Sequence, residues 1–342
     1  MQLTTIKLHT PYLLFFGDVR EPMNAKTGLG IAYWAPDRCA GQMKFPGCSV
    51  ESGLPNVSVA EALGSGVRTV IIGVAPTGGQ LQDNWLPPLI ELANAGVDIA
   101  AGLHSKLEDF PELVRAARVS GARLIDVRMP PAGLPCGTGR RRAGKRVLTV
   151  GTDCAVGKMY SALALHRELK KRNANATFRA TGQTGIMIAG EGIPIDAVVA
   201  DFIAGAAETL SPDNESDHWD VIEGQGSLIH PGYAGVTLGL IHGSQPDALV
   251  LCHEANRESI QDVGGNFPIS PLDECIELAL TAARLTNPEC VCAGISINTS
   301  GLSEKDRAEY LADLHRQLSL PVVDPVVAGI APIADFLLER LA

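Results

Sequence analysis

The sequence has few aromatic residues and no surplus of basic ones. Aromatic residues make up 5% of the 342-residue chain, whereas hydrophobic residues as a whole make up 46%. The 28 lysines and arginines are outnumbered by 38 aspartates and glutamates, which gives a formal net charge of −10. A nucleic-acid-binding protein needs a basic face to hold phosphates, so we expect no nucleic-acid partner. An aliphatic core with 36 glycines is typical of α/β proteins.

The chain also lacks long apolar runs and paired cysteine motifs. No stretch reaches the ~18 apolar residues of a membrane span, and Pro11 interrupts the short apolar run near the start. We therefore expect neither a signal sequence nor a membrane partner. The eight cysteines are scattered and form no CxxC pair, which predicts neither a zinc site nor a disulfide framework. A cytoplasmic location is the expectation.

The stretch from Arg146 to Leu169 has the strongest functional signature. Residues 147–150 form an apolar, β-branched run that predicts a buried strand, and the pattern after Lys158 predicts a helix of about four turns. Between them lies a loop that ends in Gly157-Lys158. This is the order of a phosphate-binding P-loop, in which loop amides, the helix N-terminus and the lysine attract an anion. The alternative is a tight strand-to-helix turn with a solvated lysine.

The loop departs from the usual P-loop pattern. Thr152 occupies the place of the first glycine, and Met159 replaces the serine or threonine that normally touches Mg²⁺. Because transfer of a γ-phosphate needs a metal held in line, Met159 favours a loop that grips the phosphates of a carrier such as coenzyme A. The residues predicted to bind this cofactor are Gly151, Thr152, Asp153, Cys154, Ala155, Val156, Gly157, Lys158 and Met159.

Repeated strand–loop–helix units predict an α/β protein with two parallel-sheet domains. The predicted boundaries are 1–135 for the first domain, 136–145 for a linker and 146–342 for the P-loop domain. The segment before the P-loop strand is rich in proline, glycine and arginine, so it is either a surface linker or a loop folded over the junction. We expect its basic cluster to be solvated. The cluster consists of Arg140, Arg141, Arg142, Lys145 and Arg146.

Several polar residues of the first domain follow predicted strands, where ligands of parallel sheets bind. They are Asp18, the loop 75–79, His104 and Arg128. A purely structural role, such as helix capping, is the alternative for each of them. Residues 19–42 are predicted to be irregular.

Two acidic residues lie at or near the P-loop. Glu223 ends an apolar strand in the manner of a Walker B carboxylate. Asp153 lies within the loop, where an acid is repelled by phosphates unless a cation or proton intervenes. Either Asp153 and Glu223 share Mg²⁺, or one of them is a general base that faces an amine, and the sequence pattern leaves both open.

Two resemblances to known families follow from these motifs. GTDCAVGK (151–158) and EGQGS (223–227) resemble the P-loop and strand-end elements of dethiobiotin synthetase, which implies Mg-ATP binding through Lys158, Asp153 and Glu223. A resemblance over nearly the whole chain is to a two-domain bacterial family with an N-terminal Rossmann-like and a C-terminal P-loop domain. Its segments here are GVAPTGG (73–79), GLHSKL (102–107), DVRMPP (126–131), the P-loop, the stretch 181–208, EGQGSLIHP (223–231) and INTS (297–300).

A branch of that family is similar to D-glutamate N-acetyltransferase, which implies acetyl transfer from acetyl-CoA to the amine of D-glutamate. The attacking amine must lose a proton, for which we select Glu223, Asp201 and His230 as candidate catalytic residues. Amides of 182–185 or 224–226 are candidates for the oxyanion site. The residues predicted to bind the amino acid substrate are Lys26, Arg38, Arg128, Gln183, Thr184, Gln225 and Arg257.

Two other functions remain open on the sequence. The dethiobiotin-synthetase-like alternative is a ligase or kinase that uses Mg-ATP, with Asp153 and Glu223 as metal ligands. The third is a non-catalytic protein that responds to a nucleotide or coenzyme A. Domains of this type commonly associate, so we expect a homo-oligomer.

Overall fold

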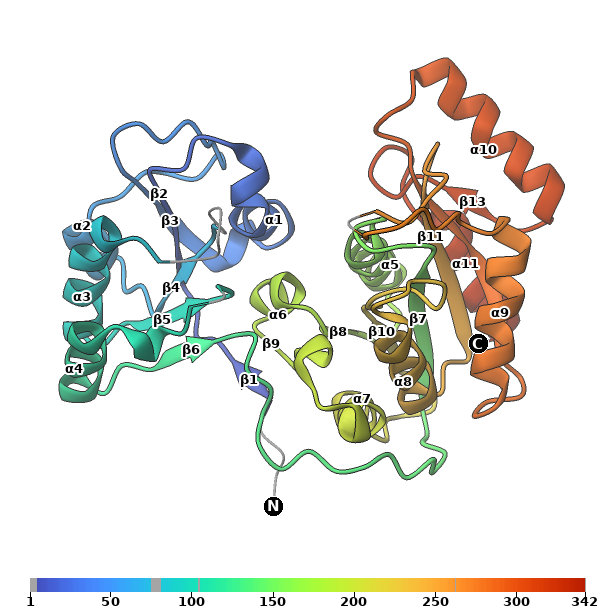
Figure 1. Cartoon of the computed structure of the whole chain (residues 1–342), viewed down its shortest axis with the longest axis horizontal. Coiled ribbons are helices and arrows are strands. Elements are labelled where there is room, and N and C mark those ends of the chain that lie inside the picture. The colour runs from blue at the N-terminus through green and yellow to red at the C-terminus, as the bar shows by residue number, and fades with distance from the viewer. Residues whose placement is uncertain (1–4, 75–80, 104, 262, 342) are drawn as a thin grey trace. The chain divides into compact units, whose positions relative to one another are not determined.

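The computed structural model describes residues 5–74, 81–103, 105–261 and 263–341 (Figure 1). The chain divides into two compact units. Of the described residues, the P-loop unit contains 132–182 and those from 195 onward, and the N-terminal unit contains those from 5 to 131 together with 183–194. Each unit has its own parallel sheet, which confirms the predicted α/β class. Within the described residues, no helix combines the length and apolar character that a membrane span requires.

The N-terminal unit is built on a five-stranded parallel sheet with the order β3-β2-β4-β5-β6. Its strands are β2 (Tyr12–Gly17), β3 (Cys39–Lys44), β4 (Thr69–Ile72), β5 (Asp98–Ala101) and β6 (Leu124–Asp126). Its helices include α1 (Lys26–Trp34), α2 (Val59–Gly64), α3 (Leu86–Asn94) and α4 (Pro111–Ser120). The helices α2, α3 and α4 pack in a row, and α3 contacts β5 (Figure 1). The strand β2, which lies between β3 and β4, is completely buried, as its YLLFFG sequence requires.

A segment from the second half of the sequence completes this unit. The helix α6 (Gln183–Ala189) packs against α1, and β9 (Glu191–Gly192) pairs antiparallel with β1 (Ile6–Lys7). The chain therefore leaves the P-loop unit after Gly182 and returns to it at Ile195.

The prediction that residues 19–42 are irregular is wrong, because α1 and the start of β3 lie there. Two glycines lower the helix propensity of α1, and no side chain caps its N-terminus. A tertiary contact compensates: the Gly28 amide donates to the Gly73 carbonyl at 2.8 Å. A Cβ atom at Gly28 would lie 2.5 Å from the Phe16 ring, so the glycines that weaken the helix also allow it to pack closely.

The P-loop unit is built on a six-stranded parallel sheet with the order β13-β12-β11-β7-β10-β8. Its strands are β7 (Lys145–Gly151), β8 (Ala176–Arg179), β10 (Trp219–Ile222), β11 (Ala248–Glu254), β12 (Val291–Asn298) and β13 (Val322–Val323). The P-loop strand β7 lies between β10 and β11, so the ends of both neighbours flank the loop. This order places chemically useful residues from three strands at one edge of the sheet.

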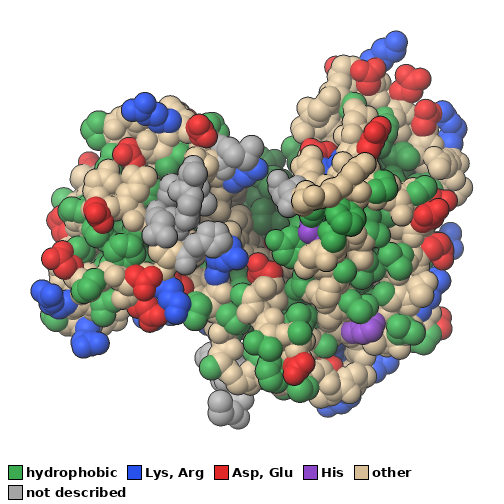
Figure 2. Space-filling view, viewed as in Figure 1, with side chains coloured by type: hydrophobic (Ala, Val, Ile, Leu, Met, Phe, Trp, Pro, Cys, Tyr) green, Lys and Arg blue, Asp and Glu red, His purple; other side chains and the backbone are tan. Residues whose placement is uncertain are grey.

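Helices cover both faces of this sheet (Figure 1). They are α5 (Lys158–Lys171), α7 (Ile203–Leu210), α8 (Ala234–Ser244), α9 (Leu272–Arg284), α10 (Glu304–Leu318) and α11 (Ala331–Leu341). The helices α5 and α11 contact each other and the sheet, and α8 contacts both α7 and α9. Apolar side chains gather over the P-loop unit on the face shown in Figure 2. On α8 and α9, Leu238 and Leu278 remain 39% and 43% exposed.

The expectation of a solvated basic cluster before β7 is wrong for two of its members. Arg142 and Arg146 are only 7% and 3% exposed. Their guanidinium groups donate to backbone carbonyls, among them that of Gly243 for Arg142 and that of Pro212 for Arg146. The segment is therefore fixed to the P-loop unit by its arginines, because a planar guanidinium carries five donors that satisfy several carbonyls at once.

Candidate active site

The loop between β7 and α5 has the geometry of an anion-binding site. Ala155 and Gly157 have positive φ angles of 56° and 99°, and this turns the loop into the first turn of α5. No side chain caps that turn. Within the described part of the chain, the backbone N–H groups of Gly157, Lys158 and Met159 donate to no backbone carbonyl. Amides at a helix N-terminus attract anions through their unpaired N–H groups and the helix dipole.

Lys158 lies inside this loop. Its side chain is 8% exposed, and Nζ donates to the backbone carbonyl of Asp153 at 2.6 Å. Burial lowers the pKa of Lys158, while the nearby charges of Asp153 and Glu223 act in the opposite direction. The ammonium group is thus held at the loop. A bound phosphate would favour the protonated form of Lys158, which burial disfavours.

Asp153 is fully buried and its carboxylate is already paired. Oδ2 accepts hydrogen bonds from Arg257 Nη1 at 2.9 Å and from the Gln261 amide at 3.0 Å. Oδ1 accepts the Cys154 amide at 2.6 Å. The guanidinium of Arg257 also pairs with Glu254. Arg257, which is predicted from the sequence to bind substrate, therefore pairs with Asp153 of the loop. Its positive charge stabilises the Asp153 carboxylate, which bound phosphates would otherwise repel.

His253 is a loop partner that the sequence analysis did not select. It lies in β11, and its Nδ1 is 2.9 Å from Thr152 Oγ1. Burial, together with the charge of Arg257, lowers the pKa of His253 to about 4. A neutral imidazole therefore supports the loop. The available signal was its position near the carboxyl end of a strand, but the pairing of β11 with β7 is not visible in the sequence.

Glu223 follows β10 and faces the loop after β8. It is 3% exposed, and Oε2 accepts the amides of Thr181 and Gly182 at 2.9 Å each. Burial raises the pKa of Glu223 to about 7, although these two amides and the charge of Lys158 act to lower it. A carboxylate with this pKa exchanges a proton near neutral pH, which is the property of a general base.

The other candidate acid–base residues differ in their surroundings. Asp201 is exposed. The neighbouring acid whose charge raises the pKa of Glu223 is Asp196 instead. His230 is 4% exposed, and its Nδ1 accepts the amides of Gly232 and Tyr233. These bonds fix Nδ1 as an acceptor, so the neutral ring carries its proton on Nε2.

Possible metal ligands also meet at the loop. Ligand atoms of Asp153, Cys154 and His230 all lie within 4.8 Å of one another. However, Mg²⁺ with ATP prefers carboxylate and hydroxyl oxygens. Three hydrogen bonds already occupy the Asp153 carboxylate, and Met159 supplies no oxygen. These donors do not fit Mg²⁺ with ATP, so we derive no step through that metal.

The predicted oxyanion donors are partly used within the protein. The Gly182 amide donates to Glu223, and the Gly224 amide donates to Thr149 Oγ1 at 2.9 Å. Gln225, a predicted substrate ligand, donates from Nε2 to Thr181 Oγ1 at 3.0 Å. These bonds hold the loops after β8 and β10 in fixed positions around Glu223.

The remaining predicted substrate residues belong to the N-terminal unit. Arg38 donates from Nη1 to the carbonyl of Ala189 at 2.7 Å and thereby holds the end of α6. Thr184 Oγ1 lies 3.1 Å from Thr27 Oγ1. Lys26 is exposed and Arg128 is half-buried. In the same unit, Gln183 Oε1 is buried and has no hydrogen-bond partner in the part of the chain that the structure describes.

Two other predictions for this unit have different outcomes. The loop 75–79 and His104 lie outside the described residues. Asp18 has a structural role, because its carboxylate accepts Trp85 Nε1 at 2.9 Å. The alternative of a structural hydrogen bond therefore holds for Asp18.

Comparison with known proteins supports both halves of this architecture. Residues 135–334 match a family described as "Domain of unknown function (DUF1611_C) P-loop domain", and residues 43–130 match "Domain of unknown function (DUF1611_N) Rossmann-like domain". These matches confirm the expected Rossmann-like and P-loop domain types.

Two curated proteins resemble the chain over nearly its full length. One, from Tritonibacter scottomollicae, is named D-glutamate N-acetyltransferase; it is 46% identical over 330 residues, which cover 96% of this chain and 99% of that protein. A second protein of the same name, from Pseudoalteromonas sp, is 46% identical over 329 residues, which cover 96% and 98%. The crystal structure of a DUF1611 family protein from Anabaena variabilis ATCC 29413 is 34% identical with a TM-score of 0.79, covering 97% of this chain and 99% of that one.

Proposed function

Because the chain belongs to the DUF1611 family, in which two curated relatives are named D-glutamate N-acetyltransferase, we propose that it transfers an acetyl group from acetyl-CoA to the amine of D-glutamate. The observation that carries the proposal is the combination of an anion-binding loop with a neighbouring buried carboxylate. Lys158 and the amides of 157–159 suit phosphates, and the pKa of Glu223, about 7, suits a general base.

In this proposal the P-loop holds the phosphates of coenzyme A. Met159 and the hydrogen-bonded carboxylate of Asp153 favour a phosphate-bearing carrier over Mg-ATP, because gripping phosphates requires no metal ligand. The phosphates and the thioester lie at opposite ends of the carrier. The carrier must therefore bend back for its acetyl carbonyl to reach Glu223.

The chemical step requires one base. The ionised carboxylate of Glu223 takes a proton from the substrate ammonium, and the resulting amine attacks the acetyl carbonyl carbon. The C–N bond forms, the nitrogen releases its second proton to water, the tetrahedral oxyanion collapses, and the C–S bond breaks to release the thiolate of coenzyme A. The proton on Glu223 then returns to the thiolate, so the carboxylate is regenerated.

The two carboxylates of the substrate need cations. Arg257 pairs with Asp153, and Arg38 holds α6, so both have structural roles. Lys26 and Arg128, the other cations of the predicted substrate set, stay predictions.

One assay tests the proposal against its alternative. The protein is incubated with acetyl-CoA and a panel of D- and L-amino acids in the absence of ATP, and free thiol is measured. Selective thiol release with D-glutamate is the expected result. Absence of thiol release, together with Mg²⁺-dependent consumption of ATP, would instead support a ligase or kinase.

A further inference from the structure

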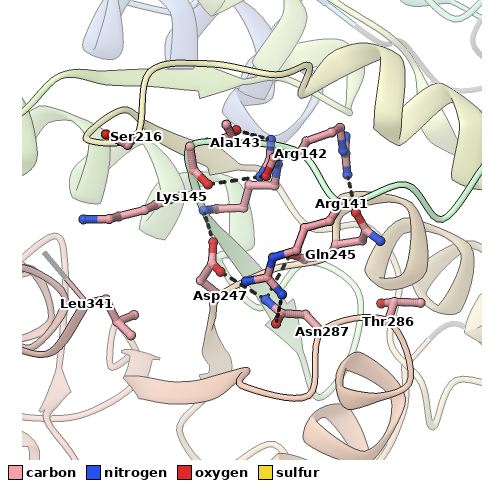
Figure 3. Close-up of a pocket in the computed structure, with 12 residues that line it drawn as sticks. Arg141, Arg142, Ala143, Lys145, Ser216, Gln245, Asp247, Thr286, Asn287 and Leu341 are labelled. Carbon is pink, nitrogen blue, oxygen red and sulfur yellow. Dashed lines mark hydrogen bonds between the residues drawn. The ribbon is translucent and has the colours of Figure 1, made fainter.

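A second site of interest lies at the opposite end of the P-loop strand. A pocket of about 340 Å³ opens at the amino end of β7, where Lys145 and Arg146 begin the strand (Figure 3). Asp247, just before β11, and Asn287, after α9, contribute to its wall. The seven residues of β7, at roughly 3.3 Å each, separate this pocket from the P-loop by about 20 Å. It is therefore distinct from the candidate active site.

The lining of this pocket is strongly basic in an acidic protein. Its four cationic residues are Arg141, Arg142, Lys145 and Arg146. Asp247 is the acidic residue of the lining, and its carboxylate already accepts hydrogen bonds from the Arg146 amide and from Asn287 Nδ2. The pocket carries a formal charge of about +3 in a chain of net charge −10.

The charges of Asp213 and Asp220 raise the pKa of both buried arginines, but burial lowers it by more. Arg142 and Arg146 donate to backbone carbonyls and to the neutral side chains of Gln245 and Ser211, and within the described ranges neither forms an ion pair. Arg142 Nε is buried and has no hydrogen-bond partner among the described residues. Burial and the charge of Arg146 lower the pKa of Arg142 to about 10, so an additional anion would relieve an electrostatic cost.

The other two cations are accessible. Arg141 is exposed and donates to Asn287 Oδ1 at 3.3 Å. Lys145 is half-buried, and its Nζ lies 5.4 Å from the centre of the Trp219 ring. Neither side chain pairs with a carboxylate in the described part of the chain. Both are therefore placed to bind an anion that enters the pocket, and Gln245 and Asn287 add neutral hydrogen-bonding groups.

We propose that this pocket binds a compact polyanion through its phosphate or carboxylate groups, with Arg141 and Lys145 as its direct ligands. The volume lies at the lower end of the range for small-molecule sites, about 300–1,000 Å³. No aromatic side chain lines it, so it offers no surface on which a nucleotide base would stack. This inference is independent of the proposed acetyl transfer.

The test uses full-length protein with Lys158→Ala, which weakens anion binding at the P-loop. Pyrophosphate and citrate are titrated by calorimetry at constant ionic strength, set with sodium chloride. Arg141→Gln and Lys145→Gln are then added singly and together. Arg140→Gln is the matched control, because Arg140 pairs with Asp213 and does not line the pocket.

We expect saturable binding of at least one anion, weakened about tenfold or more by the double substitution and unchanged by Arg140→Gln. Tighter binding of pyrophosphate would assign phosphate groups to the ligand, and tighter binding of citrate would assign carboxylates. The single substitutions, each with an intermediate loss, exclude misfolding as the cause. The proposal is overturned if neither anion saturates, or if the double substitution leaves the affinity unchanged.

Discussion

The substitution Glu223→Gln tests the general base and its environment together. Glutamine has nearly the same shape, and its carbonyl oxygen still accepts the amides of Thr181 and Gly182. It cannot accept the substrate proton. Loss of a positioned base typically lowers the rate about 10²–10⁴-fold. We therefore expect the kcat of acetyl transfer to fall by this factor while the fold is retained.

The magnitude of the effect on stability follows from the pKa of Glu223. Burial raises this pKa from its ordinary value of 4.5 to about 7, so the folded state binds the proton more tightly than the unfolded state. The contribution of Glu223 to stability is consequently lost as pH rises from about 4.5 to about 7. The gap of roughly 2.5 pH units, at about 1.36 kcal/mol each, corresponds to about 3 kcal/mol. Glu223→Gln removes this loss, so we expect the variant to be more stable than wild type by about 3 kcal/mol at pH 8 and by about 1 kcal/mol at pH 5.

Two measurements check this reasoning. Thiol release between pH 6 and 8 should rise about tenfold in the wild type, because the ionised fraction of a base with a pKa of about 7 rises from about 0.1 to about 0.9. Urea unfolding at pH 5 and pH 8 gives the stability of each variant. Glu339→Gln, at an exposed position of α11, is the control. The reasoning is refuted if Glu223→Gln keeps wild-type activity, or if its stability does not exceed that of wild type at pH 8.

Three further substitutions probe the P-loop and its supports. Lys158→Ala should weaken binding of coenzyme A about 30- to 160-fold by calorimetry, since a charged donor contributes about 2–3 kcal/mol. Lys170→Ala, at an exposed position of α5, is the control, and a Lys158→Ala affinity equal to that of wild type would remove the phosphate-binding role. Arg257→Met leaves the buried Asp153 carboxylate without its cation, so urea unfolding should show a loss of about 3–5 kcal/mol in the free energy of unfolding. Adding Asp153→Asn should restore part of this loss, and additive losses from the two substitutions would contradict the pairing. Because burial and the charge of Arg257 lower the pKa of His253 from 6.5 to about 4, the contribution of His253 to stability should fall by about 3 kcal/mol as pH falls through this range, opposite in sign to that of Glu223. His253→Gln should lack that dependence, and identical pH profiles would count against a buried neutral imidazole.

The sequence was sufficient for features that depend on neighbouring residues. The strand β7, the loop and the helix α5 lie where periodicity and glycine positions predict them. These signals are local, because a buried strand, a turn with positive φ and an amphipathic helix each require particular residues at short spacing. The position of Glu223 directly after a strand was also predicted, because an apolar strand that ends in an acid is a local pattern.

The partners of these residues were decided by the tertiary structure. Arg257 lies 104 positions after Asp153, and the strand order β11-β7-β10 brings it to the loop. The same order places His253 against Thr152 and buries Arg142 among distant carbonyls. Helix propensity alone also failed to predict α1, because its glycines are favourable only through the close packing they allow against neighbouring residues. A short sequence pattern determines what a segment forms by itself, whereas charge pairing and burial depend on which strands become neighbours.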